Sequence, residues 1–265
     1  MGSLVFIGLG LNNEYDLTLK GLEKARKADK VYIELYTNPM PSLSIKNLEK
    51  MVGKKIVILR RKDLEEKAEE VLIKKAEKNN VALIVPGDPM IATTHVWIRL
   101  EAEKKGIKTE VIHAPSIYSA APSIIGLQIY KFGKTVTIPF PKENYRPKTP
   151  YEVIKENFTR GLHTLVLLDV DAEKGRWMSI KEGLEYLLNI EEEEKSEIAT
   201  PEKLVVGLAG LGSEKPIVKA DSISRILNFD FKIYPQTIIF PGKLHFIEVE
   251  ALHLLANAPK EVLKE

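Results

Sequence analysis

Two stretches of the chain decide its fold, Phe6-Ile7-Gly8-Leu9-Gly10-Leu11 and Val81-Ala82-Leu83-Ile84-Val85-Pro86-Gly87-Asp88-Pro89. In each, a short apolar run ends in glycine, which is typical of a buried strand of a parallel sheet that leads into a turn with accessible main chain. In open α/β sheets, ligands bind outside the carboxyl ends of such strands. The two stretches therefore predict an α/β fold with a ligand site at these strand ends.

The first stretch does not complete the dinucleotide-binding fingerprint. That fingerprint requires a third glycine three residues after the second, where a helix opens beneath a pyrophosphate. The residue at that position is Asn13. A nicotinamide cofactor is therefore not predicted, which leaves a site for another ligand or a glycine turn that only lets strand and helix pack closely.

The second stretch places a carboxylate, Asp88, directly after a glycine that tolerates positive φ. Asp followed by Pro is also a favoured pair at a helix N-terminus. Two interpretations stay open: Asp88 binds a ligand, or it caps a helix over 93–105. A third strand end, His113-Ala114-Pro115-Ser116, closes with a small hydroxyl residue in the same way and favours the ligand.

Composition excludes several classes of site. The net charge is +2 and the lysines alternate with glutamates, so no nucleic-acid surface is predicted. The chain has no cysteine, which excludes disulfides, thiolate zinc sites and a cysteine nucleophile. The five histidines show no metal-ligand spacing, and no metal site is predicted.

The same composition bears on the protein's environment. No apolar run approaches the ~20 residues of a membrane span, and a signal-peptide pattern is missing at the start, so we expect a cytoplasmic protein. Two glutamines, no cysteine and many Lys and Glu residues indicate a heat-adapted source.

Strands and helices alternate along the chain. We predict a largely parallel sheet from strands at 4–9, 30–36, 55–60, 81–86 and 108–113, with helices near 18–28, 43–52, 64–78 and 92–105. We predict a mixed, α+β-like half from strands at 135–139, 163–170, 203–209, 216–220 and 236–240, with helices near 117–126, 150–160, 179–191, 221–228 and 245–256. We interpret Ala114-Pro115 as a hinge, so the predicted domains are 1–114 and 115–265.

These motifs resemble the tetrapyrrole-methylase-type, or class III, S-adenosylmethionine-dependent methyltransferases, and within that class the diphthine synthases. The general motifs are Gly8-Leu9-Gly10, Leu17-Thr18-Leu19-Lys20-Gly21 and Pro86-Gly87-Asp88-Pro89. The more specific passages are Glu34-Leu35-Tyr36-Thr37, Ala92-Thr93-Thr94-His95, His113-Ala114-Pro115-Ser116-Ile117-Tyr118, Glu143-Asn144-Tyr145-Arg146-Pro147, Gly161-Leu162-His163-Thr164 and Pro241-Gly242-Lys243-Leu244-His245. Together they cover nearly the whole chain.

The resemblance implies a two-domain tetrapyrrole-methylase-like fold with S-adenosylmethionine in a cleft between the domains, and a homodimer. It also implies N-methylation of a modified histidine on translation elongation factor 2 during diphthamide biosynthesis. Carried over by position, the cofactor-binding residues are Leu11, Asp88, Ile91, Ser116, Ile117, Leu168, Leu211 and Gln236. For the aliphatic members, core packing is the alternative explanation, and their cofactor contacts would be mainly through the backbone.

No catalytic residue is assigned. A sulfonium methyl group is already activated, so alignment of donor and amine in a closed site can supply much of the catalysis. The candidate proton acceptors or substrate contacts are His95, His113, Tyr118 and His163. The candidates for binding a substrate carboxylate are Lys131, Lys134, Arg176 and Lys243.

The chain also departs from the pattern that the resemblance leads us to expect. Glycine stands at Gly210 where arginine is expected, and Gln236 stands where histidine is expected. Two other functions therefore stay open beside the leading one: a class III methylase acting on a tetrapyrrole-like small molecule, and a binding or scaffold protein that keeps the fold without turnover.

Overall fold

The computed structural model describes residues 2–142 and 145–263, so the Glu143-Asn144 part of one quoted motif lies outside the described residues. Contacts within the chain divide it into two compact units. The first unit runs to Ile117 and includes the short segment Ala172–Lys174, while the second begins at Tyr118. The division falls just beyond the predicted boundary at 114, and a later segment returns to the first unit.

The first unit is built on a sheet of five parallel strands, which confirms the parallel sheet predicted for this half. The strands stand in the order β3-β2-β4-β1-β5. Their bounds are β1 Ser3–Gly8, β2 Lys30–Glu34, β3 Ile56–Leu59, β4 Asn80–Val85 and β5 Lys108–Ile112. Because β1 lies between β4 and β5, the three strand ends singled out in the sequence are neighbours.

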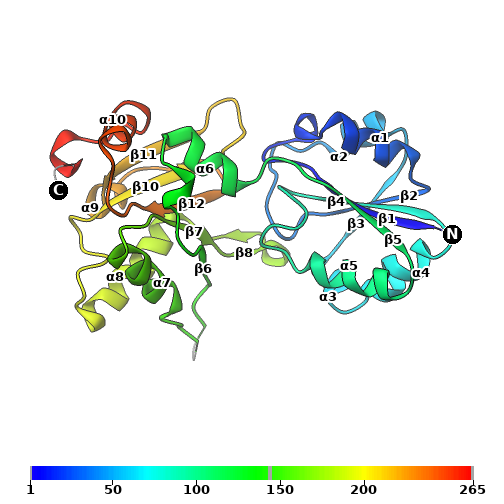
Figure 1. Ribbon diagram of the computed structural model, residues 1–265, viewed down its shortest axis with the longest axis horizontal. Coiled ribbons are helices and arrows are strands. Elements are labelled where there is room, and N and C mark those ends of the chain that lie inside the picture. Colours follow the sequence, from blue (N-terminus) through cyan, green and yellow to red (C-terminus); the bar gives the residue numbers. More distant parts are fainter. Residues whose placement is uncertain (1, 143–144, 264–265) are drawn as a thin grey trace. The chain divides into compact units, whose positions relative to one another are not determined.

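Helices cover both faces of this sheet, with α1 and α2 on one face and α3, α4 and α5 on the other (Figure 1). The side chains of β1 explain the two layers: Leu4 and Phe6 lie in one apolar core, Val5 and Ile7 in the other. Because a strand covered on both faces must be apolar throughout, the continuous apolar run in the sequence is accounted for. The helical elements are η1 Glu14–Asp16, α1 Leu19–Lys27, α2 Ile45–Val52, α3 Arg61–Glu65, η2 Glu69–Ile73, α4 Lys74–Ala76 and α5 His95–Lys104.

Two predicted helices differ in the structure. The helix predicted over 64–78 is broken into α3, the π-helical turn η2 and α4. The helix predicted over 92–105 begins at His95, with Thr94 as its N-cap residue. Ala92 has a φ of 54°, which lies in the left-handed region and cannot belong to a right-handed helix.

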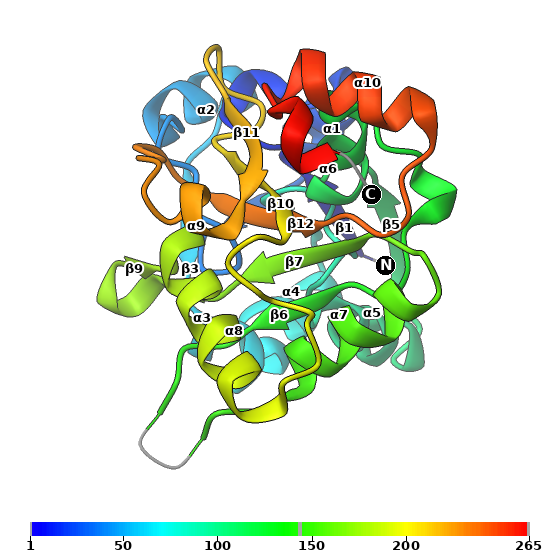
Figure 2. The same ribbon diagram turned by 90° about the vertical axis from the view of Figure 1, so that its left-hand side faces the viewer.

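The second unit contains a five-stranded sheet with the order β11-β10-β12-β7-β6 (Figure 2). β6 and β7 pair in parallel and the other neighbours pair antiparallel, which confirms the predicted mixed sheet. The strand predicted over 163–170 is divided, because its end forms β8, which pairs with β9. The strands are β6 Val136–Ile138, β7 Thr164–Leu168, β8 Val170–Asp171, β9 Arg176–Trp177, β10 Leu204–Ala209, β11 Ile217–Ser222 and β12 Gln236–Phe240.

In this unit α7 and α8 cover one face of the sheet, and α6 and α10 lie on its other side (Figure 1). Tyr151, Leu184 and Ile238 are among the buried residues of its core. The helical elements are α6 Ile117–Ile125, η3 Ile129–Lys131, α7 Thr149–Thr159, α8 Ile180–Glu194, α9 Ile223–Ile226, α10 Phe246–Leu255 and η5 Lys260–Leu263. The short helix η4 Ala172–Lys174 is the segment that belongs to the first unit. No helix among the described residues has both the length and the apolar character that a membrane span requires.

Candidate functional site

Main-chain hydrogen bonds join the segments that follow β1 and β4. Gly10 N donates to Gly87 O over 3.2 Å, and Gly87 N donates to Gly10 O over 2.7 Å. Both glycines have a positive φ, 84° and 67°, a conformation that other residues rarely adopt. The two glycine turns picked out in the sequence therefore lie together at the carboxyl edge of the first sheet.

Gly8 is required for a different reason, which is space. A Cβ atom at this position would lie 2.7 Å from the Ala114 Cβ and 2.7 Å from the Gly87 carbonyl oxygen. The segments that follow β4 and β5 therefore approach each other across the end of β1. Residues from these two segments meet although β4 and β5 are not neighbouring strands.

Asp88 bridges these two segments. Its Oδ1 accepts a hydrogen bond from Met90 N at 3.1 Å, and its Oδ2 lies 2.7 Å from His113 Nδ1. The interpretation of Asp88 as the cap of the next helix is wrong, because that helix begins only at His95. The carboxylate instead accepts from the N–H two residues ahead, and an Asx turn of this kind gives the same sequence signal as a helix cap.

Leu11 follows the first glycine turn, and its main chain is held by Asp16. The Oδ2 atom of Asp16 accepts hydrogen bonds from Leu11 N at 3.0 Å and from Asn12 N at 2.7 Å. A Cβ atom at Gly10 would lie 2.4 Å from the Asp16 Cβ, so the acid packs closely against this turn. Asp16 thus shapes the loop that carries Leu11.

The other predicted residues of the first unit lie in the same region. Ile91 N donates to Asp88 O at 3.2 Å, and the Ile91 side chain is 39% exposed. Ser116 is buried and Ile117 is half-buried, both after β5. The structure therefore places the five predicted residues of this unit in the segments that follow three adjacent strands.

The three predicted residues of the second unit also gather at one edge of their own sheet. Leu168 ends β7, Gln236 begins the antiparallel β12, and Leu211 follows β10. All three are buried. A Cβ atom at Gly183 of α8 would lie 2.7 Å from Leu168 Cδ2, so this leucine side chain packs against the helix.

Gln236 is hydrogen-bonded at both ends of its amide. Its Oε1 accepts from Ile180 N at 2.8 Å, and its Nε2 donates to Phe231 O at 2.7 Å and to Ile233 O at 3.0 Å. The glutamine thus supports the start of α8. Gly210 has a φ of 60°, and a Cβ atom there would lie 2.4 Å from Ile233 Cδ1, so this backbone favours glycine over the expected arginine.

His95 and Glu34 form a buried polar pair behind the Asp88 turn. His95 Nδ1 lies 3.2 Å from Pro89 O, and because a carbonyl only accepts, Nδ1 carries the hydrogen. His95 Nε2 lies 3.9 Å from Glu34 Oε1, and both side chains are fully buried. Burial lowers the pKa of His95 to about 4, so the ring is neutral at pH 7 and holds the turn rather than acting as a base.

Glu34 ends β2, and three donors meet its carboxyl group. The N–H groups of Tyr36 and Thr37 donate to Oε2 at 3.0 and 3.1 Å, and the Thr37 hydroxyl donates to Oε1. Burial outweighs these hydrogen bonds and raises the pKa of Glu34 to about 7. The Glu34 carboxyl therefore titrates near neutral pH beside the neutral His95 ring.

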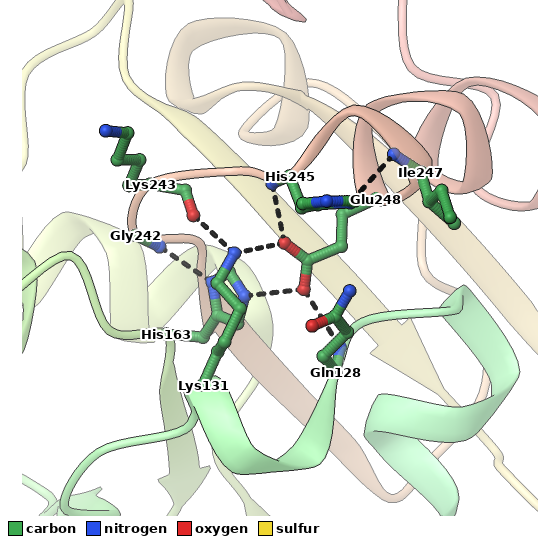
Figure 3. Close-up of polar contacts among 8 residues, drawn as sticks. All are labelled: Gln128, Lys131, His163, Gly242, Lys243, His245, Ile247 and Glu248. Atoms are coloured by element: carbon green, nitrogen blue, oxygen red, sulfur yellow. Dashed lines mark hydrogen bonds and ion pairs between the residues drawn. The ribbon is translucent and has the colours of Figure 1, made fainter.

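Glu248 is the centre of a second buried network, in the second unit (Figure 3). It accepts hydrogen bonds from Gln128 N at 2.9 Å, His245 N at 2.8 Å and His163 Nε2 at 3.0 Å, and it pairs with Lys131. Burial alone would raise the pKa of Glu248, but these donors outweigh it and lower the pKa to about 2. Glu248 therefore stays ionised and joins η3, β7 and α10.

This network engages two of the predicted catalytic candidates. His163 Nδ1 accepts from Gly242 N at 2.9 Å while Nε2 donates to Glu248, and the ring is buried, so His163 is not available as a proton acceptor. Lys131 is bound to Glu248 and to Lys243 O, so it is not free to bind a substrate carboxylate. Both residues act as supports at the opposite end of β7 from Leu168.

The remaining candidates have more ordinary surroundings. Arg176 pairs with Glu182 at 3.0 Å and lies 3.9 Å from the centre of the Phe140 ring. Lys134 and Lys243 are exposed, and Tyr118 is half-buried. Their contacts among the described residues do not single out a catalytic role.

A cavity of about 260 Å³ lies at the amino ends of β1, β4 and β5, opposite the carboxyl ends of these strands where the glycine turns lie. Ser3, Lys24, Asn80 and Glu110 are among its lining residues. Lys24 and Glu110 pair across it. It lies away from the glycine turns and is not part of the candidate site.

Three carboxylates that support these sites were not predicted from the sequence: Asp16, Glu34 and Glu248. The sequence does contain a signal for Glu34, because this acid stands at the end of an apolar strand. Asp88 was noticed for the same reason, since it comes shortly after the end of another apolar strand. For Glu248 the local signal is its place three residues after His245, as in a capping box, whereas its partners Gln128 and His163 are far away in the chain.

The raised pKa of Glu34 makes a prediction about stability. Because the folded protein binds a proton here that the unfolded chain releases, the free energy of unfolding should fall as pH rises from about 4.5 to about 7. Glu34→Gln keeps an acceptor for the two N–H groups and removes this titration. Relative to wild type, the variant should gain on the order of 2–3 kcal/mol between pH 5 and pH 8 in urea unfolding.

Glu66→Gln, at an exposed carboxylate of the same unit, controls for the lost negative charge. A stability difference between Glu34→Gln and wild type that stays constant from pH 5 to pH 8 would contradict the assignment.

Comparison with known proteins identifies the family to which the chain belongs. A model of the tetrapyrrole (corrin/porphyrin) methylases matches residues 3–218. Diphthine synthases of Methanosphaera stadtmanae and Methanocaldococcus jannaschii are 46% and 48% identical to it, over 99% and 96% of this chain and 99% of each relative. A crystal structure of a diphthine synthase superposes with a TM-score of 0.90 at 40% identity, covering 98% of both chains. The chain therefore belongs to the tetrapyrrole methylase family and, within it, to the diphthine synthases, the methyltransferases of diphthamide biosynthesis.

Proposed function

We propose that this protein transfers methyl groups from S-adenosylmethionine to the amino group of 2-(3-amino-3-carboxypropyl)histidine on translation elongation factor 2, giving diphthine. One observation carries the proposal: the predicted cofactor residues of the first unit gather at the carboxyl edge of one parallel sheet, which is where α/β sheets bind ligands. The full-length similarity to diphthine synthases supports the substrate. A cytoplasmic location follows from this substrate, since elongation factors act on cytoplasmic ribosomes.

The residues at this edge suit the chemistry of S-adenosylmethionine. Its ribose hydroxyls and ammonium group are donors, and Asp88 offers a carboxylate with acceptor positions beyond those used by Met90 and His113. A Cβ atom at Gly87 would meet nothing within 4 Å, so the main chain is open to a ligand there. We assign the cofactor to Leu11, Asp88, Ile91, Ser116 and Ile117, with Leu168, Leu211 and Gln236 contributing from the second unit.

When bound, S-adenosylmethionine supplies a methyl group on a positively charged sulfur, ready for in-line attack by an amine. The protein's task is then to hold the amine in line and exclude competing water. The Gly10–Gly87 hydrogen bonds and the Asp16 carboxylate fix the main chain of the cofactor loops before binding. Because the Gln236 amide is already bonded at both ends, its contact would come from the backbone.

We also propose that the protein is a homodimer, formed through an apolar surface on η3 and α10. Gln128 and Lys131 connect these two elements through Glu248, so their exposed side chains belong to one surface. The large apolar side chains of these two elements that are 52–83% exposed are Ile129, Tyr130, Phe246, Ile247, Leu254 and Leu255. An exposed apolar cluster of this kind is typical of a protein interface.

The function is tested by methyl transfer. Wild-type protein should bind S-adenosylmethionine in calorimetry and give no heat with a nicotinamide cofactor. With labelled donor, it should transfer label to elongation factor 2 that carries the 3-amino-3-carboxypropyl group and not to the unmodified factor. Label on a porphyrin-type substrate instead would favour a small-molecule methylase, and binding without any transfer would favour a scaffold.

Asp88→Asn tests the cofactor site. If the carboxylate accepts donors of the cofactor, the variant should bind S-adenosylmethionine about 10- to 100-fold more weakly, because a hydrogen bond to a charged group contributes ~1.5–3 kcal/mol. Asp29→Asn is the matched control, since Asp29 also accepts from a main-chain N–H, that of Asn80 at 2.7 Å, at the other edge of the sheet. Equal affinities in wild type and Asp88→Asn would remove Asp88 from the site.

The dimer is tested by measuring mass in solution. Wild type should sediment as a dimer, and Phe246→Glu should shift the equilibrium to monomer because Phe246 is 73% exposed within the apolar cluster. Leu19→Glu controls for adding a charge at an exposed leucine of the first unit, which is 85% exposed. A monomeric wild type, or a dimer that Phe246→Glu leaves intact, would refute this surface.

A further inference from the structure

His113 is the exposed end of a carboxylate–imidazole pair. Its Nδ1 lies 2.7 Å from Oδ2 of Asp88. The Asp88 side chain is 8% exposed whereas the His113 side chain is 73% exposed. A nearly buried carboxylate therefore holds an imidazole whose other end faces solvent at the edge of the sheet.

The hydrogen bond fixes the chemistry of the ring. An ionised carboxylate only accepts, so in the neutral imidazole the hydrogen is on Nδ1. Nε2 then carries a lone pair. A neutral imidazole in this tautomer, oriented by a carboxylate, is the arrangement of a general base.

The other four histidines, all in the described part of the chain, are placed differently. His95 is buried against Pro89 O, and His163 is buried with both nitrogens engaged. His253 binds Ala258 O through Nδ1, and His245 caps α10. Among the five, His113 alone combines a nearly buried carboxylate partner with a mostly exposed ring.

We propose that His113 is the proton acceptor of methyl transfer and that Asp88 is its positioning residue. The assignment rests on the proposed function. Nε2 of His113 takes a proton from the ammonium form of the substrate, which leaves an amine with a free lone pair. The amine nitrogen then forms the bond to the methyl carbon while the carbon–sulfur bond breaks, and its electron pair stays on sulfur as a neutral thioether.

The geometry also accounts for repeated transfer. Each methylation yields an ammonium ion, which must lose a proton before it can attack again. The exposed imidazolium returns its proton to water between rounds, and the negative charge of Asp88 stabilises the imidazolium while it lasts. Since Asp88 also follows the glycine turn proposed to contact the cofactor, one carboxylate places base and methyl donor on the same edge.

His113→Asn provides a selective test. The asparagine Nδ2 replaces Nδ1–H as donor to Asp88, so the turn keeps its hydrogen bond while the proton-accepting nitrogen is lost. We expect an unchanged melting temperature, an S-adenosylmethionine Kd within about threefold of wild type, and a kcat reduced ~100-fold at pH 7, as for loss of a general base. The loss should shrink at higher pH and be partly restored by added imidazole. His253→Asn is the control and should leave kcat unchanged.

A second readout does not depend on turnover. Nitrogen-15 spectra of the free protein should show His113 in the Nδ1–H tautomer, and Asp88→Asn should abolish this preference. If wild type transfers no methyl group, the proposed function falls; if wild type is active and His113→Asn keeps its kcat, only the role of His113 is refuted. An Nε2–H tautomer in the free protein would refute it as well.

Discussion

The candidate site depends on the close approach of three chain segments at Gly8. A side chain there would collide with the Ala114 Cβ and with the Gly87 carbonyl, so only glycine lets the segments after β4 and β5 close over the end of β1. Two main-chain hydrogen bonds between Gly10 and Gly87 then fix the spacing of the turns. Because this geometry is set by the backbone, Asp88 reaches across a strand to His113 without distortion of the sheet. Core packing on both faces of β1 keeps the strand in place beneath them.

Glu34 and Glu248 are both buried, but their pKa values shift in opposite directions, and the donors that each carboxylate meets account for the difference. Burying an ionised carboxylate is costly unless donors satisfy it. Glu248 meets four, one of them the cation of Lys131, and its pKa falls to about 2. Among the described residues, Glu34 meets two main-chain N–H groups and a hydroxyl but no cation within hydrogen-bonding distance, and its pKa rises to about 7. The Glu248 network behaves as a permanent ion pair that ties elements together. The Glu34 carboxyl instead titrates near neutral pH, and its neighbour His95 holds the Asp88 turn through Pro89 O.

The sequence was most informative where a residue's surroundings follow from its own neighbours. Strands covered on both faces must be apolar, so the parallel strands can be predicted from continuous runs of apolar residues. Glycines with positive φ mark the ends of these strands. The role of Asp88 was ambiguous because an Asx turn and a helix cap share one local pattern, and the left-handed Ala92 that separates Asp88 from α5 leaves no trace in composition. Pairs such as Asp88 with His113, or Glu34 with His95, depend on strand order. That order is set by packing of whole elements rather than by any short segment.

A carboxylate has about four acceptor positions, and the fold uses two of those on Asp88. The bond to Met90 N fixes the turn, and the bond to His113 fixes the imidazole, so neither group must be ordered when a ligand arrives. Under the proposed function, the remaining positions accept hydrogen bonds from donors of the cofactor. In the proposed reaction, the methyl donor and the proton acceptor must be held at a constant separation. In that proposal Asp88 places both groups, because it holds the His113 ring and belongs to the glycine turn assigned to the cofactor.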